Sequence, residues 1–268
     1  MATQPIQTAD YWDQTADGYI AGAEPFTGLF CRDAVELAEV LPGTTLLDIA
    51  TGPGALAIAA AEAGARVTAI DFSPVMIERL HSRARHLDVQ ALRMDGQALD
   101  FPSDHFDRVA SVFGIPLFPD WRAGLAEAAR VLRPGGLAVI GVADNPYGFG
   151  PNQLFAEARL RLFPDEAIDM GVAGMTVLDD AERLAAALRH AGFGDVTLHP
   201  RTHEIAIDPT LLAADNPMIV GNPLIAGLAP SVRKAVIDMA RELAERWRDG
   251  DVIRMPGTAR LAVATKAG

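Results

Sequence analysis

Cysteine is almost absent from this sequence. Cys31 is the only cysteine among 268 residues, which excludes an intrachain disulfide and a metal site built from several thiolates of one chain. The histidines add no metal motif, because His199 and His203 flank Pro200 in a stretch predicted to be a strand. Their spacing there does not direct two ligands toward one metal ion. We therefore expect no metal site.

Basic residues are also in short supply. Lysine and arginine together number 23, against 35 aspartates and glutamates, so the formal net charge is −12. Such a surface repels the phosphates of nucleic acids and of anionic lipids. We therefore expect neither nucleic acid nor a membrane as a partner. A small pocket with a local positive potential remains compatible with this balance, and the oligomeric state stays open.

Long hydrophobic runs are missing. The longest, Ala55–Ala61, falls well short of the ~20 residues that a helix needs to cross a bilayer. The amino end, MATQPIQTAD, has neither the basic nor the apolar segment of a secretory signal. Hydrophobic residues nevertheless make up 50% of the chain, which is enough for a large core. We expect a soluble, cytoplasmic protein.

Short apolar strands alternate with helices along most of the chain. Gly64 is placed to end the first helix, and Ser73 with Pro74 supplies an N-cap and a first-turn proline for the next. This alternation predicts a mainly parallel sheet with helices on both faces. The expected strands are 46–49, 66–70, 89–94, 108–113, 137–142 and 196–199, and the expected helices are 55–63, 74–85, 121–132 and 179–191.

Three regions exceed this minimal alternation. They are residues 1–45, which contain a predicted helix over 32–40, and residues 143–177 and 209–250. Insertions at the carboxyl ends of parallel strands fall where ligands bind in open α/β sheets. We expect one domain over 1–268, with 1–45 as an amino-terminal helical cover and the two later regions as lid insertions.

A glycine turn joins the first strand to the first helix in LLDIATGPGALAIAAAEAGARVTAIDFSP, residues 46–74. Gly52-x-Gly54-x-x-Ala57 matches the dinucleotide fingerprint, and Asp71 ends the second strand. The glycines let the backbone approach a ligand, the helix amino terminus favours an anionic group, and Asp71 can accept hydrogen bonds from a ribose diol. NAD and S-adenosylmethionine would be served almost equally well, and a tight turn without ligand also satisfies the pattern.

Asp48 separates the two cofactors. It lies at the end of the first strand, just before the glycines. A nearby carboxylate disfavours a pyrophosphate, whereas it favours a ligand that carries an ammonium and a sulfonium, as S-adenosylmethionine does. Alternatively, Asp48 only caps the turn and contacts no ligand.

Five motifs in order extend this interpretation. They are Leu47-Asp48-Ile49-Ala50-Thr51-Gly52-Pro53-Gly54, Ile70-Asp71-Phe72-Ser73-Pro74-x-Met76, Arg93-Met94-Asp95-Gly96-Gln97, Phe106-Asp107-Arg108-Val109 and Arg130-Val131-Leu132-Arg133-Pro134-Gly135-Gly136. Through them the chain resembles the class I S-adenosylmethionine-dependent methyltransferases, in particular the ubiquinone and menaquinone C-methyltransferases, over roughly residues 11–142. Ala50 departs from the glycine common there. The resemblance implies a Rossmann-like, mainly parallel seven-stranded sheet whose last strand, near 259–265, runs antiparallel between its neighbours at the sheet edge.

The resemblance also implies roles for individual residues. Asp48 and the backbone of 50–54 would hold the methionine part of the cofactor, Asp71 the ribose hydroxyls, and Tyr19 of the helical cover would reach the methionine carboxylate. Phe72 and Met76 would flank the adenine, which would meet residues 95–97 at its amino edge. The residues implied to bind the cofactor are Tyr19, Asp48, Ala50, Gly52, Gly54, Asp71, Phe72, Met76, Asp95, Gly96, Gln97 and Phe113, the last on the methyl donor's side.

Methyl transfer is an in-line displacement at a carbon already activated by the sulfonium, so the protein contributes mainly placement and desolvation. A base is needed only where the nucleophile must lose a proton. Tyr147 and His203 are the candidates, although their positions in a loop and on an exposed strand face account for them without a catalytic role. Arg201 is a candidate contact to an anionic substrate or a surface ion pair. The catalytic set is therefore open.

The acceptor is predicted from composition alone. If part of the apolar set in the cover segments faces inward, the acceptor is a small, largely apolar molecule. That set is Phe149, Phe155, Phe163, Met170, Met175, Met218, Ile219, Leu224 and Ile225. Three alternatives stay open: an NAD(P)-dependent oxidoreductase, a protein that binds S-adenosylmethionine without transferring methyl, and an enzyme that uses the fold for another reaction such as cyclisation.

Overall fold

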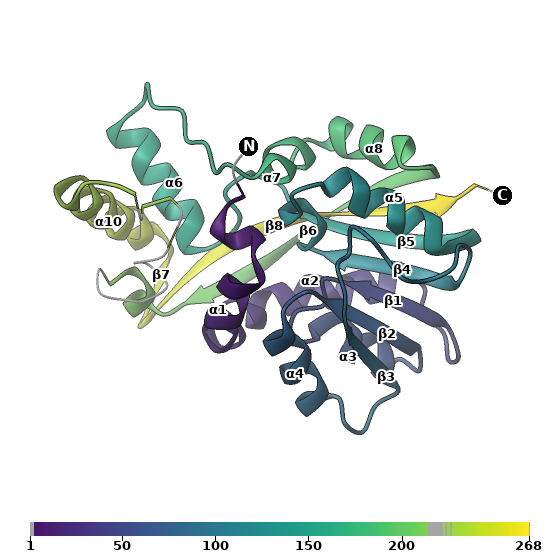
Figure 1. Ribbon diagram of the computed structural model, residues 1–268. Helices are drawn as coiled ribbons and strands as arrows, with labels where there is room; N and C mark the ends of the chain where they lie inside the picture. Colours follow the sequence, from purple (N-terminus) through teal and green to yellow (C-terminus); the bar gives the residue numbers. More distant parts are fainter. Residues whose placement is uncertain (1–2, 214–221, 223, 226, 268) are drawn as a thin grey trace. The chain divides into compact units, whose positions relative to one another are not determined.

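Figure 1 shows the computed structural model, which describes residues 3–213, 222, 224–225 and 227–267. These residues group into two compact units. The second unit overlaps both predicted lid insertions, and the single-domain organisation stays a prediction. The first unit comprises Met1–Val142, Gly171–Arg201 and Ala259–Gly268, and the second comprises Ala143–Met170 and Thr202–Thr258.

Five parallel strands form the larger part of the sheet, in the order β3-β2-β1-β4-β5. Leu47 in β1 lies between Thr68 of β2 and Val109 of β4. Because the chain continues to β2 on one side of β1 and later to β4 on the other, the switch point of the sheet lies beside β1, where ligands of open α/β sheets bind. The five strands are β1 (Thr45–Ile49), β2 (Arg66–Asp71), β3 (Val89–Arg93), β4 (Phe106–Val112) and β5 (Leu132–Ala143).

The sheet continues from β5 to β8 (Val252–Lys266) and then β6 (Phe193–Ile207). The two ends of β8 reveal its direction. The main-chain N of Asp144, just after β5, donates to the Thr258 carbonyl, whereas Nζ of Lys266 donates to the carbonyl of Arg130, just before β5. β8 therefore runs antiparallel to β5 and lies between its neighbours, as predicted. The two-residue β7 (Arg248–Asp249) pairs antiparallel with β8 outside the seven-stranded path.

Helices cover both faces of the sheet because successive strand residues point to opposite sides. Leu47 and Ile49 pack with α5 (Trp121–Val131) and α8 (Ala181–His190). Leu46 packs on the other face with α3 (Ala55–Glu62) and α4 (Pro74–Arg83). Asp48 follows the alternation of Leu46 and therefore belongs to the face of α3 and α4.

The amino-terminal residues form three helices, η1 (Pro5–Gln7), α1 (Ala9–Gly22) and α2 (Glu24–Leu37). The predicted helix over 32–40 is therefore wrong at both ends. α2 opens earlier because Pro25 stands in its first turn, where the missing N–H does no harm. It ends before 40 because Glu39 adopts a left-handed backbone with φ 50°. The short helices η2 (Ile115–Leu117) and α7 (Ala173–Leu178) complete the first unit.

The second unit is built around two helices, α6 (Pro151–Leu162) and α10 (Pro230–Ala244), which pack against each other. Its buried side chains include Phe155, Leu224 and Val236. Arg246, in η4 (Glu245–Trp247), donates to Glu157 of α6, and η3 (Pro209–Leu212) precedes α10. None of the described helices combines the length and the apolar character that a membrane crossing requires.

Candidate active site

The turn between β1 and α3 has an unusual backbone. Ala50, Gly52 and Gly54 have φ values of 58°, 55° and 97°, a region that glycine adopts freely and alanine only with strain. A Cβ on Gly54 would lie 2.2 Å from Cδ1 of Leu80 in α4. The glycine is therefore needed for close packing of the turn on α4.

Asp48 is a buried carboxyl directly before this turn, with 2% of its surface exposed. Burial, and to a smaller extent the neighbouring Asp71, raises the pKa of Asp48 to about 7, although a 2.6 Å hydrogen bond from Thr51 Oγ1 to Oδ2 opposes the shift. Among the ion pairs of the described residues, none involves Asp48. A buried carboxylate without a cationic partner is destabilised, so a bound cation would stabilise it.

Asp71 ends β2 and holds two main-chain groups. Its Oδ2 accepts from the N–H of Gly52 and its Oδ1 from the N–H of Ser73, both at 2.9 Å. Burial raises the pKa of Asp71 to about 6, and these hydrogen bonds oppose the shift. Because an ionised carboxylate has about four lone-pair sites, it can still accept from two hydroxyls. Asp71 thus ties the end of β2 to the glycine turn and keeps acceptor capacity for a ribose.

The residues predicted to flank an adenine ring follow β2. Phe72 is half-buried, and its carbonyl accepts from Nε of Arg93 at 3.2 Å. Met76 is buried in the first turn of α4, where its N–H donates to Oγ of the N-cap Ser73 at 3.1 Å. The predicted cap of α4 is confirmed, while contact of Phe72 and Met76 with adenine stays a prediction.

The loop after β3 is held by its own side chains. Oδ1 of Asp95 accepts from both the main-chain N and Nε2 of Gln97, at 2.9 and 3.0 Å. Oε1 of Gln97 accepts from the N–H of Asp120 at 2.8 Å. A Cβ on Gly96 would lie 2.7 Å from Cζ of Phe118, so a larger residue does not fit without movement. Gln97 therefore positions the loop, whatever it contributes to a ligand.

Two helices of the amino-terminal cover approach the ends of the strands. Phe113 directly follows β4 with φ 65°, strained for a bulky residue, and its ring packs edge-to-face on Phe30 of α2 with centroids 5.5 Å apart. The Tyr19 hydroxyl of α1 shares a 3.1 Å hydrogen bond with Oγ1 of Thr27 in α2. Burial raises the pKa of Tyr19, and Asp71 is close enough to raise it further. Tyr19 thus lies near the cluster of Asp48, Gly52 and Asp71.

Two contacts of this cluster were not foreseen from the sequence. Oδ1 of Asp13 in α1 accepts from Oγ of Ser73 at 2.5 Å and from the N–H of Val75 at 3.4 Å. Nη1 of Arg83, in the last turn of α4, donates to the carbonyl of Pro53 at 2.9 Å. An arginine in a last helical turn is explained by the helix dipole alone, so nothing in the pattern marked Arg83.

The candidate catalytic residues lie in the second unit. Tyr147 precedes α6, and its N–H donates to Oδ1 of Asn145 at 3.0 Å. His203 lies on β6, which extends past the predicted strand 196–199 at both ends. Their roles stay predictions, and Met218 and Ile219 lie outside the described residues. Across the part of the chain that the structure describes, no three His, Cys, Asp or Glu side chains could together hold a metal ion.

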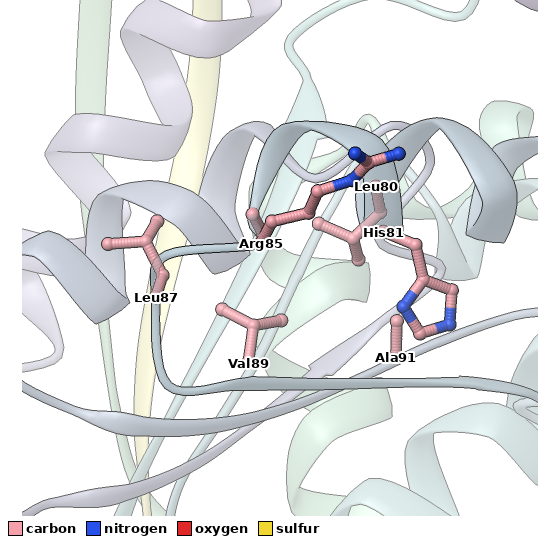
Figure 2. Close-up of a pocket in the computed structure, with 7 residues that line it drawn as sticks. Leu80, His81, Arg85, Leu87, Val89 and Ala91 are labelled. Atoms are coloured by element: carbon pink, nitrogen blue, oxygen red, sulfur yellow. The ribbon is translucent and has the colours of Figure 1, made fainter.

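A surface hollow of about 240 Å³ lies between α4 and β3. Figure 2 shows Leu80 and His81 on the helix above Val89 and Ala91, with Arg85 and Leu87 on the connecting chain. None of the residues predicted to bind the cofactor lines it. This hollow is therefore separate from the candidate site.

Comparisons with known proteins identify the family of the chain. Residues 46–136, from β1 into β5, match the family model described as a methyltransferase domain. An uncharacterised protein of Mycobacterium tuberculosis is 40% identical over 104 residues, which cover 38% of either chain. The match thus spans well under half of the length of this relative. A solved structure from Anabaena variabilis, described as a proposed methyltransferase of antibiotic biosynthesis, superimposes with a TM-score of 0.62 at 16% identity, covering 88% of this chain and 96% of the other.

One relative covers enough length to establish the family. The demethylmenaquinone methyltransferase of Corynebacterium efficiens is 31% identical over 169 residues, which are 61% of this chain and 71% of the relative. The region that matches the family model, residues 46–136, includes the strands and turns that carry Asp48, the glycine turn and Asp71. The chain belongs to the class I S-adenosylmethionine-dependent methyltransferases, among those of the quinone methyltransferase type.

Proposed function

We propose that this protein transfers the methyl group of S-adenosylmethionine to a small, largely apolar organic acceptor. The observation that carries the proposal is the buried carboxyl of Asp48, which lies beside a turn with three left-handed backbone positions. Among the described residues, Asp48 forms no ion pair with a basic side chain. A cationic ligand with an amino acid end suits this place, since its ammonium and sulfonium offset the buried charge. A pyrophosphate does not, which favours S-adenosylmethionine over NAD.

The chain's own residues would hold the cofactor from three sides. The carboxyl of Asp48 and the turn 50–54 would receive the methionine part, with Tyr19 above it, and Asp71 would accept from the ribose hydroxyls. The loop 95–97 and the side chains of Phe72 and Met76 would surround the adenine, and Phe113 would line the side of the methyl group.

Methyl transfer from a sulfonium needs little acid–base catalysis. The acceptor's nucleophilic atom forms a bond to the methyl carbon while the carbon–sulfur bond breaks, and the electron pair of that bond stays on sulfur as a neutral thioether. Holding the acceptor in line and excluding water are the protein's contribution. An acceptor that must lose a proton needs a base, for which Tyr147 and His203 are the candidates.

The acceptor is proposed from the relatives of this chain, several of which are named demethylmenaquinone methyltransferases. Demethylmenaquinone with a shortened side chain is therefore the first acceptor to test, followed by other small apolar molecules that carry one nucleophilic atom.

Binding is tested first, by thermal unfolding with S-adenosylmethionine, S-adenosylhomocysteine or NADH. A ligand at about 100 times its Kd adds roughly 2.7 kcal/mol to the free energy of unfolding. We expect both sulfur nucleosides to raise Tm, and Asp71→Ala to weaken the effect by removing the acceptor for the ribose. Stabilisation by NADH alone would contradict the proposal.

Transfer is tested next with S-adenosylmethionine labelled in its methyl group. Labelled product from one of the offered acceptors supports the proposal. Tight binding without product from any acceptor would favour a protein that binds the cofactor without transferring methyl.

A further inference from the structure

A side chain from α4 holds the middle of the glycine turn. Nη1 of Arg83 donates to the carbonyl of Pro53 at 2.9 Å and to Oε1 of Glu24 at 2.7 Å. The Glu24 side chain is 9% exposed, so the ion pair with Arg83 is shielded on the glutamate side. Because Pro53 has no N–H, its carbonyl is the one polar main-chain group of that residue.

The rest of the turn is held from the sheet. The N–H of Thr51 donates to the carbonyl of Ile70, and the N–H of Gly52 donates to Asp71, both at 2.9 Å. These bonds restrain the start of the turn. The N–H of Gly54, in the same peptide group as the Pro53 carbonyl, donates to the Thr51 carbonyl at 3.1 Å. The hydrogen bond from Arg83 adds a second restraint on this peptide group, from outside the turn.

We propose that Arg83 is a positioning residue for the cofactor. Its hydrogen bond to Pro53 fixes the backbone of the turn against which the methionine part binds. The ion pair with Glu24 holds the guanidinium in place and links α2 of the amino-terminal cover to the turn. The proposal rests on the proposed function, since it takes the turn to be the binding surface for S-adenosylmethionine.

Arg79 provides a matched control on the same helix. Its Nε donates to Oδ1 of Asp17 in α1 at 2.9 Å, and its side chain is 35% exposed, against 37% for Arg83. Arg79→Gln and Arg83→Gln therefore each remove one charge and one ion pair between α4 and the amino-terminal helices. Only Arg83→Gln also releases a carbonyl of the glycine turn.

The experiment measures the Kd of S-adenosylhomocysteine by calorimetry, well below the unfolding temperature of every variant. We expect Arg83→Gln to raise Kd about tenfold or more, the effect of a hydrogen bond to a charged group, and Arg79→Gln to change it less than about twofold. Arg83→Lys keeps the positive charge but lacks the forked geometry of the guanidinium, so its Kd should lie between those of the other two variants. Amide exchange of residues 51–55 in the absence of ligand should quicken in Arg83→Gln and stay unchanged in Arg79→Gln.

The outcomes separate this proposal from the function on which it rests. If the unaltered protein fails to bind S-adenosylhomocysteine, both fall. If it binds and Arg83→Gln binds equally well, or if Arg79→Gln loses as much affinity, only the positioning role is overturned. Should Arg83→Gln not fold, Arg83→Lys decides, because unaltered affinity and exchange in that variant contradict the role.

Discussion

Several residues at the candidate site have a pKa value or a backbone conformation that their sequence neighbours do not require. Asp48 and Asp71 are carboxyls with raised pKa values inside one hydrogen-bonded cluster. Ala50 and Phe113, at the ends of β1 and β4, adopt positive φ values. Strained backbone and perturbed carboxyls both gather at functional sites, and here they gather at the carboxyl ends of neighbouring strands.

The strain at Ala50 can be relieved by glycine. With φ 58°, alanine costs about 1–2 kcal/mol in this region, partly offset by the greater flexibility of glycine in the unfolded chain. We therefore expect Ala50→Gly to raise the free energy of unfolding by about 0.5–1 kcal/mol in urea titrations. Ala59→Gly, inside α3, is the control and should lower it by about 1 kcal/mol. Equal destabilisation by both would mean that Ala50 is unstrained.

Among the elements, α1 and α4 are joined by acidic side chains of α1. Asp13 accepts from Ser73 and Val75 at the start of α4. The ion pair of Asp17 with Arg79, one turn later, is more exposed and contributes little to this link. The start of α4 also follows Asp71 and Phe72 directly, so α1 is tied to the loop that is proposed to hold the ribose and adenine. Docking of α1 and order in that loop should therefore depend on each other.

Removal of the Asp13 carboxylate tests this link. Ser73 still caps Met76, so α4 stays helical in Asp13→Ala, while the variant loses about 1–2 kcal/mol of stability as two donors lose their shared acceptor. We expect amide exchange over residues 9–22 to accelerate selectively. Asp10→Ala, an exposed position in the same helix, should leave exchange unchanged. Acceleration spread evenly over the chain would argue against a local link.

For the molecule as a whole, the buried carboxyls make stability depend on pH. The pKa of Asp48 and of Asp71 is raised by burial to about 7 and about 6. An acid with a raised pKa contributes stability below its unfolded pKa and loses that contribution as the pH rises through the folded value. These two groups therefore lower the stability of the empty protein between about pH 4 and pH 7. Glu127, whose pKa a hydrogen bond from Arg130 lowers, acts in the opposite direction.

A cationic cofactor should reverse the effect of Asp48. Because binding favours the ionised carboxyl, the Kd of S-adenosylmethionine should decrease by up to about tenfold for each unit by which the pH rises toward 7, and should level off above pH 7. Asp48→Asn should flatten this dependence and make the empty protein more stable than the unaltered one at pH 8. The difference between the two proteins, followed by calorimetry from pH 5.5 to 8, isolates Asp48 from the other acids. A parallel pH profile in the variant would contradict the assignment.

Most of the elements of the first unit were predictable because their signals are local. Ser73 and Pro74 open α4, Gly64 with φ 94° follows α3, and the apolar run of 46–49 forms a buried strand. The helices at the amino end were less predictable, since α1 contains Gly18 and Gly22 and only Ala16 of α1 is buried. A helix that is stabilised mainly by contacts to α4 leaves only a weak periodic pattern in its own residues.

The sequence by itself determined the alternation of strands and helices from β1 to β5, the glycine turn and the two acids that frame it, because spacing and residue type specify these within a few turns of chain. Only the tertiary structure decided how the site is held. Asp13 meets Ser73, and Arg83 meets both Glu24 and Pro53, across stretches of 30 to 60 residues. The pKa values of Asp48 and Asp71 likewise depend on burial by other elements. Such contacts arise when distant segments pack, and no local pattern encodes them.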